Sequence, residues 1–127
     1  QMKMNSWGIS QQDGDALLAH LIANNFLNEE RFAAAFVSGK VNIKKWGKVK
    51  IRHHLKQKFI SDYSINCALN AIDDEVYQNH LTSLAVKKFN LLEKEKDPFT
   101  RKGKVYKYLL SKGYETDSIR SVIDALN

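Results

Sequence analysis

The residues most suited to binding another molecule are the cations between Lys40 and Phe59. This stretch reads KVNIKKWGKVKIRHHLKQKF and contains neither Asp nor Glu. Its cations are Lys40, Lys44, Lys45, Lys48, Lys50, Arg52, Lys56 and Lys58. A concentration of cations without acids binds a polyanion or an acidic protein surface, although the same charges also suit an ordinary solvated face. The net charge of +6 favours an electrostatic partner.

No side chains in the sequence have the spacing of a catalytic or metal site. The histidines match no ligand motif and are His20, His53, His54 and His80. Cys67 has no cysteine partner, and the glycines stand singly, so they form no phosphate-binding loop. Paired carboxylates, as at Glu29 and Glu30, begin helices and suit the helix dipole. We therefore expect a binding protein that is not an enzyme and has neither metal nor cofactor.

The elements that position these cations are all expected to be helices. Apolar residues recur at helical spacing, and no stretch alternates with a period of two. The basic stretch itself predicts a loop with Trp46 and Gly47, then a helix with Ile51, Leu55 and Phe59 on one face. The other expected helices are Gln11–Asn24, Glu29–Ser38, one carrying Ile65 to Ile72, Glu75–Leu92, Phe99–Lys112 and a last one from Thr116 or Asp117.

Several local features predict how these helices end and what they bury. We expect Gly39 to end the second helix, and Phe32, Ala35 and Phe36 to face the core. Cys67 lies beside apolar residues, which predicts a buried, reduced thiol.

Self-similarity along the chain predicts a repeated three-helix unit. Leu55, Ile65 and Leu69 have counterparts of the same kind in Leu109, Ile119 and Ile123. We expect a first repeat at residues 1–39, a second at 40–97 and a third at 98–127, stacked into an elongated, curved array. Because any all-helical chain with short turns shows some self-similarity, an accidental match is the alternative.

The repeat also predicts a second group of cations on the binding surface. These residues are Arg101, Lys102, Lys104 and Lys107, one repeat after the first group. If the repeats stack, both groups lie along the same side and form a cationic stripe. Trp46 is the aromatic residue expected to be exposed on it, and packing in the seam between units is the alternative.

Length and composition favour a small cytoplasmic protein. The chain has 127 residues, of which 43% are hydrophobic, so it can form one domain or a short array with a core. No apolar run approaches the roughly 20 residues that span a bilayer, and the first residues lack the apolar core of a signal peptide. We expect a monomer in the cytoplasm.

Two joined motifs resemble the RecX family of regulatory proteins. The first is FLNEERFAAAFVSGK at Phe26–Lys40, and the second is WGKVKIRHHLKQKFI at Trp46–Ile60. In that family the segment reads G-F/L-D-D-E-R-F-A, followed by G-x-x-K/R-I-x-x-x-L-x-x-K-G-I. The resemblance extends from Trp7 to Tyr114. Asn25 and Phe59 stand where the family favours glycine, and Phe59 would adopt a left-handed backbone at a cost.

The resemblance implies both an architecture and a role. Family members are tandem three-helix repeats that modulate the RecA recombinase, and through it DNA repair, recombination and the SOS response. They bind in the groove of the RecA filament on single-stranded DNA and usually inhibit its ATPase and strand exchange. By the same comparison, the first and last repeats of this chain are expected to be incomplete.

Two other functions fit the same residues. A helix-turn-helix module would place the Gly47–Phe59 helix in the major groove and bind duplex DNA sequence-selectively. A scaffold for acidic proteins would have little affinity for single-stranded DNA.

Overall fold

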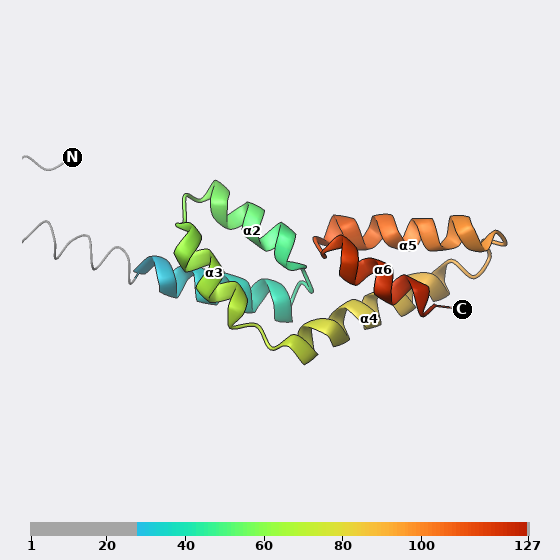
Figure 1. Cartoon of the computed structure of the whole chain (residues 1–127), viewed down its shortest axis with the longest axis horizontal. Coiled ribbons are helices and arrows are strands. Elements are labelled where there is room, and N and C mark those ends of the chain that lie inside the picture. The colour runs from blue at the N-terminus through green and yellow to red at the C-terminus, as the bar shows by residue number, and fades with distance from the viewer. Residues whose placement is uncertain (1–27, 127) are drawn as a thin grey trace, which may run out of the picture.

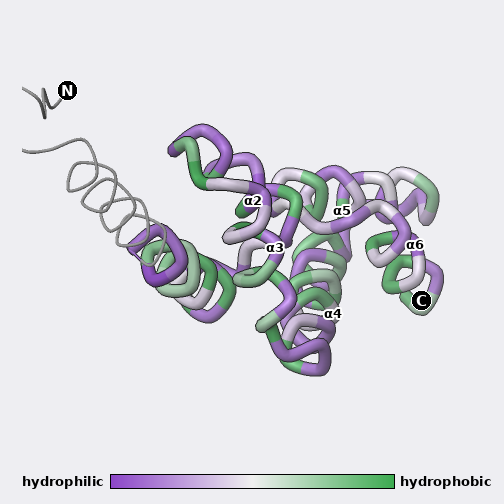
Figure 2. The backbone as a smooth tube through the Cα atoms, turned by 60° about the vertical axis from the view of Figure 1, so that its left-hand side comes forward, coloured by the Kyte–Doolittle hydropathy of each residue, from purple (hydrophilic) through white to green (hydrophobic). Residues whose placement is uncertain are grey.

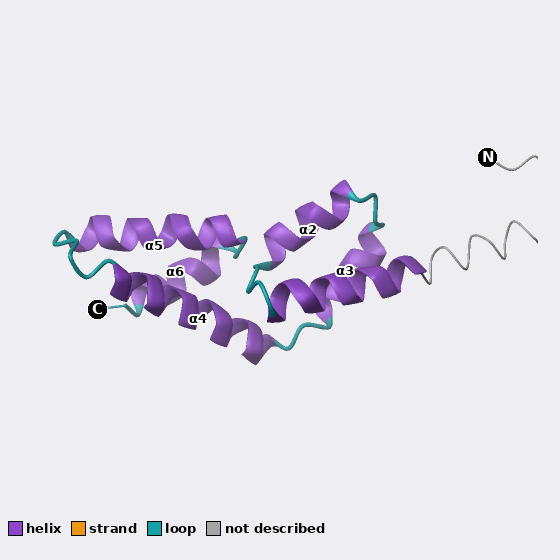
Figure 3. Cartoon of the chain, turned by 180° about the vertical axis from the view of Figure 1, so that it is seen from behind, coloured by secondary structure: helices purple, strands orange, loops and turns teal. Residues whose placement is uncertain are grey.

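A computed structural model describes residues 28–126 of the chain. Over these residues it contains helices and turns and no strand (Figures 1 and 3). Residues 28–42 are helical and are followed by α2 (Lys48–Gln57), α3 (Asp62–Asn70), α4 (Asp74–Leu91), α5 (Pro98–Lys112) and α6 (Thr116–Asp124). The predicted all-α fold is confirmed. The expected helix Gln11–Asn24 lies outside the described residues.

The first bundle consists of the helical segment 28–42, α2 and α3. One side chain in three or four along each helix is apolar and faces the other two helices, as amphipathic helices require. Its buried core consists of Ala33, Val37, Val41, Ile51, Leu55, Ile65, Ala68 and Leu69. Phe36, Trp46 and Ile60 are partly buried and pack against this core.

The second bundle consists of α4, α5 and α6. Its buried core consists of Tyr77, Leu81, Ala85, Phe89, Val105, Leu109, Tyr114, Ile119, Val122, Ile123 and Leu126. Figure 2 shows hydrophobic and hydrophilic residues alternating along these helices, consistent with one buried and one exposed face. The two bundles follow each other along the long axis of the molecule, which is an elongated array of three-helix units (Figure 1).

The two cores divide the chain at a different place from the repeats expected at 40–97 and 98–127. The first core ends with Leu69 and the second begins with Tyr77, and Ile72 between them packs against both. The physical reason is that a repeat period does not fix where each unit begins. The same three helices recur whichever turn is chosen as the start, and only the burial of side chains sets the boundary.

The structure corrects the predicted burial in the segment 28–42. Phe32 is 44% exposed and Ala35 is exposed, whereas Ala33, Val37 and Val41 are buried. The helix also continues through Gly39 to residue 42. Burial of Val41 against the first core stabilises this extra turn and outweighs the weak helix propensity of glycine.

Two further predictions of burial are wrong. Phe59 lies beyond the end of α2 and is 92% exposed, so the apolar face of α2 consists of Ile51 and Leu55 alone. Cys67 is exposed, because it points away from the core that Ala68 and Leu69 enter on the same helix.

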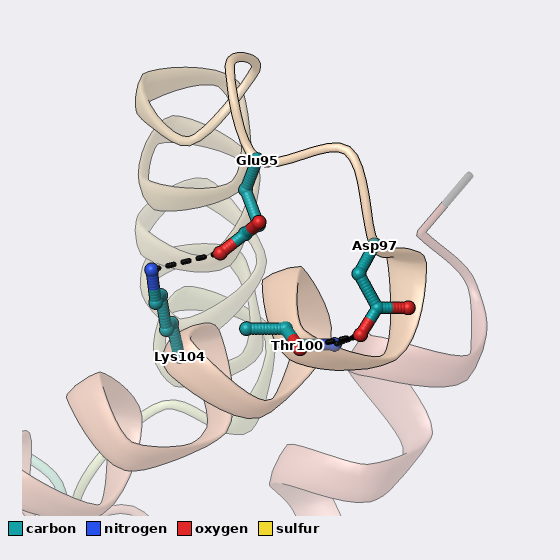
Figure 4. Close-up of polar contacts among 4 residues, drawn as sticks. All are labelled: Glu95, Asp97, Thr100 and Lys104. Atoms are coloured by element: carbon teal, nitrogen blue, oxygen red, sulfur yellow. Dashed lines mark hydrogen bonds and ion pairs between the residues drawn. The ribbon is translucent and has the colours of Figure 1, made fainter.

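Most helix ends follow local capping chemistry. Ser61 and Asp73 cap α3 and α4 by accepting hydrogen bonds from the amides three residues later. Asp97 caps α5 in the same way, through the amide and hydroxyl of Thr100, and Lys104 pairs with Glu95 beside it (Figure 4). Gly113 ends α5 with a left-handed backbone at φ 95°.

The start of α2 differs from these helix ends, because the second bundle caps it. α2 has no side-chain cap and no acid in its first turn. Instead, the Gly47 amide donates to the Lys112 carbonyl at 2.7 Å, and the Val49 amide donates to the Gly113 carbonyl at 2.9 Å. The carbonyl end of α5 thus satisfies amides that would otherwise have no partner. In Figures 1 and 3, α5 and α2 follow one another along the same edge of the molecule.

Tyr77 and Tyr114 complete this join between the bundles. The Tyr77 hydroxyl donates to Glu115 at 2.6 Å and accepts from the Lys48 amide at 2.8 Å. The Tyr114 hydroxyl donates to the Lys45 carbonyl at 2.7 Å. Burial, and then the bond to Glu115, raise the pKa of Tyr77, so its hydroxyl keeps the proton that it donates.

Candidate nucleic-acid interface

The cations of the first group gather around two aromatic rings of the first bundle. Lys40 Nζ lies 4.7 Å from the centre of the Trp46 ring, and Lys50 Nζ lies 4.4 Å from it. The His54 ring centre is 4.8 Å from that of Trp46. Lys40 and Lys58 also lie over Phe36, at 5.3 and 6.0 Å. We call the set Lys40, Lys50, His54 and Lys58, with Phe36 and Trp46, the cation cluster.

Three elements position the cation cluster. Lys50 and His54 are four residues apart and share one face of α2, one position before the buried Ile51 and Leu55, and Lys58 follows at the C-terminal cap of the helix. Phe36 and Lys40 stand one turn apart on the segment 28–42. Trp46 lies in the loop that joins the segment 28–42 to α2. Its ring is half-buried against the core of the first bundle rather than in the seam between the bundles.

The charges of the cation cluster act on His54. Its pKa is lowered, first by desolvation and then by the positive charges of His53, Lys50, Lys40 and Lys58. A histidine whose electrostatic neighbours are all cations loses its proton more readily than a free one. The face is therefore a region of concentrated positive potential, which attracts anions.

Of the other predicted cations of the first group, Lys44, Lys45 and Lys48 lie at the join between the bundles. Lys45 Nζ donates to the Asn42 carbonyl at 2.9 Å, and Lys48 Nζ lies 4.8 Å from the Tyr77 ring centre. The exposed Lys44 accepts a bond at its carbonyl from Lys112 Nζ at 3.0 Å. Arg52 is half-buried on α2. Lys56 pairs with Asp62 at 3.0 Å, which offsets its charge.

The second group of cations is largely engaged within its own bundle. Arg101 donates from Nε and Nη2 to the Phe89 carbonyl, at 3.0 and 2.6 Å, and stacks on the Phe89 ring. It thereby caps the end of α4. Lys104 pairs with Glu95 at 2.9 Å. Lys102 is half-buried, which leaves the exposed Lys107 as the second-group lysine most open to solvent. The cation cluster therefore keeps its charges without an acidic partner among the described residues, although Lys50 Nζ donates to the Ser111 carbonyl at 3.4 Å.

Sequence reasoning missed His54 and Phe36 as members of this surface. His54 was considered as a metal ligand and matched no ligand motif. The signal for it was present, because Lys50, His54 and Lys58 have the spacing of one helix face. No such signal exists for Lys40 and Trp46 meeting over α2, since that contact depends on how two helices pack.

Two classes of site have no counterpart in the part of the chain that the structure describes. No three His, Cys, Asp or Glu side chains gather there in a way that could hold a metal ion. None of its helices combines the length and the apolarity needed to cross a bilayer.

Two family descriptions match the two bundles. Residues 28–69 match "RecX, second three-helix domain", and residues 75–123 match "RecX, third three-helix domain". The limits of both matches fall close to the division between the two cores.

Sequence relatives agree with these matches. Regulatory protein RecX of Clostridium botulinum (strain Eklund 17B / Type B) is 37% identical over 127 residues, covering 98% of this chain and 59% of the relative. Regulatory protein RecX of Chlorobium phaeobacteroides (strain BS1) is 34% identical over 112 residues, covering 88% of this chain and 71% of the relative. The chain thus spans about three fifths of the length of the clostridial relative.

Solved structures share the fold. A crystal structure of RecX from Lactobacillus salivarius matches 94% of this chain, and 77% of its own, with a TM-score of 0.72 at 24% identity. A crystal structure of regulatory protein RecX matches 95% of this chain, and 59% of its own, with a TM-score of 0.70 at 25% identity. Because domain limits, sequence and fold all agree, the chain belongs to the RecX family of regulatory proteins.

Proposed function

We propose that this protein is a non-enzymatic regulator of the RecA recombinase. It binds the RecA filament on single-stranded DNA as a monomer in the cytoplasm and inhibits ATP hydrolysis and strand exchange. The basic surface, Lys40 to Lys58 with Trp46 and with Arg101, Lys102, Lys104 and Lys107, faces the filament. Within it, the cation cluster makes the main contact and the α5 cations contribute less.

The observation that carries this proposal is the unneutralised charge on an elongated pair of bundles. The ion pairs within the described residues are Lys56–Asp62 and Lys104–Glu95, and neither includes a member of the cation cluster. A cationic face on a rod-like molecule suits a long, negatively charged partner, because many weak contacts along its length add up. Membership of the RecX family supports RecA as that partner.

The packing of α2 argues against the helix-turn-helix alternative. In such modules the first residues of the recognition helix contact base edges in the major groove. Here the amides of Gly47 and Val49 are bonded to the end of α5, and Tyr77 bonds the amide of Lys48. The amides at the start of α2 are therefore bonded to the second bundle, which limits how deeply this end of the helix could enter a groove.

A titration of RecA activity tests the proposed function. The protein is added to cognate RecA on single-stranded DNA, and ATP hydrolysis and strand exchange are followed. We expect both rates to fall at ratios up to one molecule per RecA subunit. Rates that stay constant, together with an unchanged filament lifetime, would reject the proposed function.

A charge reversal in the cation cluster tests the proposed contact. Lys40→Glu with Lys50→Glu should raise the concentration needed for half-inhibition by roughly tenfold, since about 1.4 kcal/mol corresponds to that factor. Lys87→Glu with Lys94→Glu, at exposed positions outside the surface, makes the same change of net charge and is the matched control. Equal effects of the two charge changes would mean that only net charge matters.

A further inference from the structure

The cation cluster concentrates like charges that repel one another in the free protein. Lys40 and Lys50 lie over the same Trp46 ring, at 4.7 and 4.4 Å from its centre. Attraction to the aromatic face partly offsets the repulsion that each of these cations feels from its like-charged neighbours. An external anion placed among them would remove the remaining repulsion.

His54 is the titratable group at the centre of this arrangement. The segment 28–42 directs Lys40 toward it, and the loop after that segment supplies the Trp46 ring. On and just after α2, the groups that act on it are Lys50, His53 and Lys58. The charges that shift its pKa are thus all positive, from every element that packs around it.

We propose that the cation cluster is a phosphate-binding site, at which binding of a nucleic-acid strand is coupled to uptake of one proton by His54. This inference rests on the proposed function only where it names a nucleic-acid strand as the source of the phosphate group. The phosphate group itself follows from the cluster, because several cations around one small region fit an anion with several acceptor oxygens.

The sign of the coupling follows from the charges. In the free protein, desolvation and the surrounding cations lower the pKa of His54, so the ring is neutral near pH 7. A bound phosphate cancels the field of the lysines and offers an acceptor, which favours the charged ring. A proton then moves from solvent to the free ring nitrogen of His54, and no other bond is made or broken. Affinity for phosphate should therefore rise as pH falls.

Binding of a labelled oligothymidylate, followed by fluorescence anisotropy from pH 8 to pH 5.5, tests this coupling. One linked proton changes affinity by up to about tenfold for each pH unit. We expect His54→Gln to remove most of this dependence and His53→Gln to keep it. Calorimetry in buffers of different ionisation enthalpy should show proton uptake with the natural chain and not with His54→Gln. A pH dependence that is identical in all three chains would overturn the proposal.

Salt dependence tests the lysines in a way that is independent of protons. Lys40→Ala should lower the slope of log affinity against log salt by about 0.7 for the phosphate contact that it removes from a single strand. Lys87→Ala on α4 is the matched control and should not change the slope. An unchanged slope in Lys40→Ala, with far-UV circular dichroism showing a folded chain, would exclude the cluster as the phosphate site.

Pyrophosphate as a competitor separates the two sources of a phosphate group. Displacement of the strand only at high pyrophosphate concentration supports the strand backbone as the natural ligand. Displacement at concentrations similar to those of the strand keeps the phosphate site and overturns the strand as its ligand. Proton-coupled binding of the strand without any effect on RecA would reject the proposed function and support the phosphate site. Inhibition of RecA without phosphate binding would support the proposed function and reject the phosphate site.

Discussion

At the scale of single residues, Phe59 is one of two non-glycine residues in the described part of the chain with a left-handed backbone, the other being Lys45. The Phe59 backbone lies in the left-handed region at φ 62°, and its side chain is 92% exposed. A non-glycine residue in this region costs roughly 1–2 kcal/mol. Because the ring is exposed, burial of its apolar surface does not offset this cost. The packing of the rest of the first bundle must offset it. Glycine adopts this backbone without strain, which is the physical reason that it would suit the turn better than phenylalanine.

Replacing Phe59 should therefore stabilise the protein in a way that depends on the backbone. Phe59→Gly removes the strain, and we expect it to be more stable than Phe59→Ala by about 1 kcal/mol, although glycine also loses more entropy on folding. Both variants remove the same exposed ring, which makes Phe59→Ala the matched control. Urea unfolding measures the difference. Equal midpoints would show that the turn relaxes without strain in solution.

At the scale of helices, the chemistry of helix ends was predictable and the extent of packing was not. Asp97 before Pro98, Ser61 before α3 and Gly113 after α5 act as their sequence indicates, because each signal lies within a few residues of the bond it makes. The end of the segment 28–42 was missed, since Val41 extends the helix through contacts with other helices.

For the candidate site too, properties of single residues were predictable from the sequence and contacts between helices were not. The cations and Trp46 could be selected from the sequence, because charge and aromaticity are properties of single residues. Which of them share one face of α2 could also be read from spacing. The engagement of Arg101 with the Phe89 carbonyl could not, since it joins the end of α4 to the start of α5. The sequence therefore indicates the candidate binding groups, and the fold indicates which of them are engaged in internal contacts.

The cap of α5 predicts how stability responds to acid. Hydrogen bonds from the Thr100 side chain and amide lower the pKa of Asp97, so the folded state favours its charged form. Stability from this cap is present above the ordinary pKa of an aspartate and is lost as pH falls through the lower folded value. Asp97→Asn should flatten the loss of stability below about pH 4. Asp124→Asn, at the last residue of α6, is the control.

Thermal unfolding measured at a series of pH values checks this prediction. Asn is also a good N-cap, so Asp97→Asn retains much of the bond to Thr100 and the helix should stay intact. If Asp97→Asn and the natural chain lose stability equally as pH falls, other carboxylates cause the pH dependence. Glu29 is the first candidate, because bonds from Ser61 and Ser64 also lower its pKa.

At the scale of the whole molecule, the join between the bundles determines how the cationic face is presented. Three consecutive amides, of Gly47, Lys48 and Val49, bind groups of the second bundle. A Cβ added at Gly47 would overlap the carbonyl group of Gly113. The backbone segments around residues 47 and 113 can approach this closely only because residue 47 is glycine. The bundles are therefore held by backbone bonds in one orientation, rather than connected by a loose linker.

Gly47→Ala should open this join without unfolding either core. The overlap with Gly113 forces α2 away from α5, and the amides of Lys48 and Val49 lose their partners, at about 0.5–1.5 kcal/mol for each bond. Hydrogen exchange should speed up at these two amides and stay slow at Leu55 and Ile119, which lie in the separate cores. Small-angle X-ray scattering should show a change in the average distance between the bundles.

Gly39→Ala provides the matched control for this last change. Gly39 lies inside the helical segment 28–42, and a Cβ there meets no neighbouring atom within 4 Å. The Gly39→Ala substitution should therefore stabilise the protein by about 0.5–1 kcal/mol through helix propensity. It should leave hydrogen exchange at the join unchanged. If Gly47→Ala keeps slow exchange at Lys48 and Val49, the join tolerates a side chain and does not fix the orientation. If it opens the join and also weakens RecA inhibition while oligonucleotide affinity is retained, the proposed function depends on the relative placement of the bundles as well as on charge.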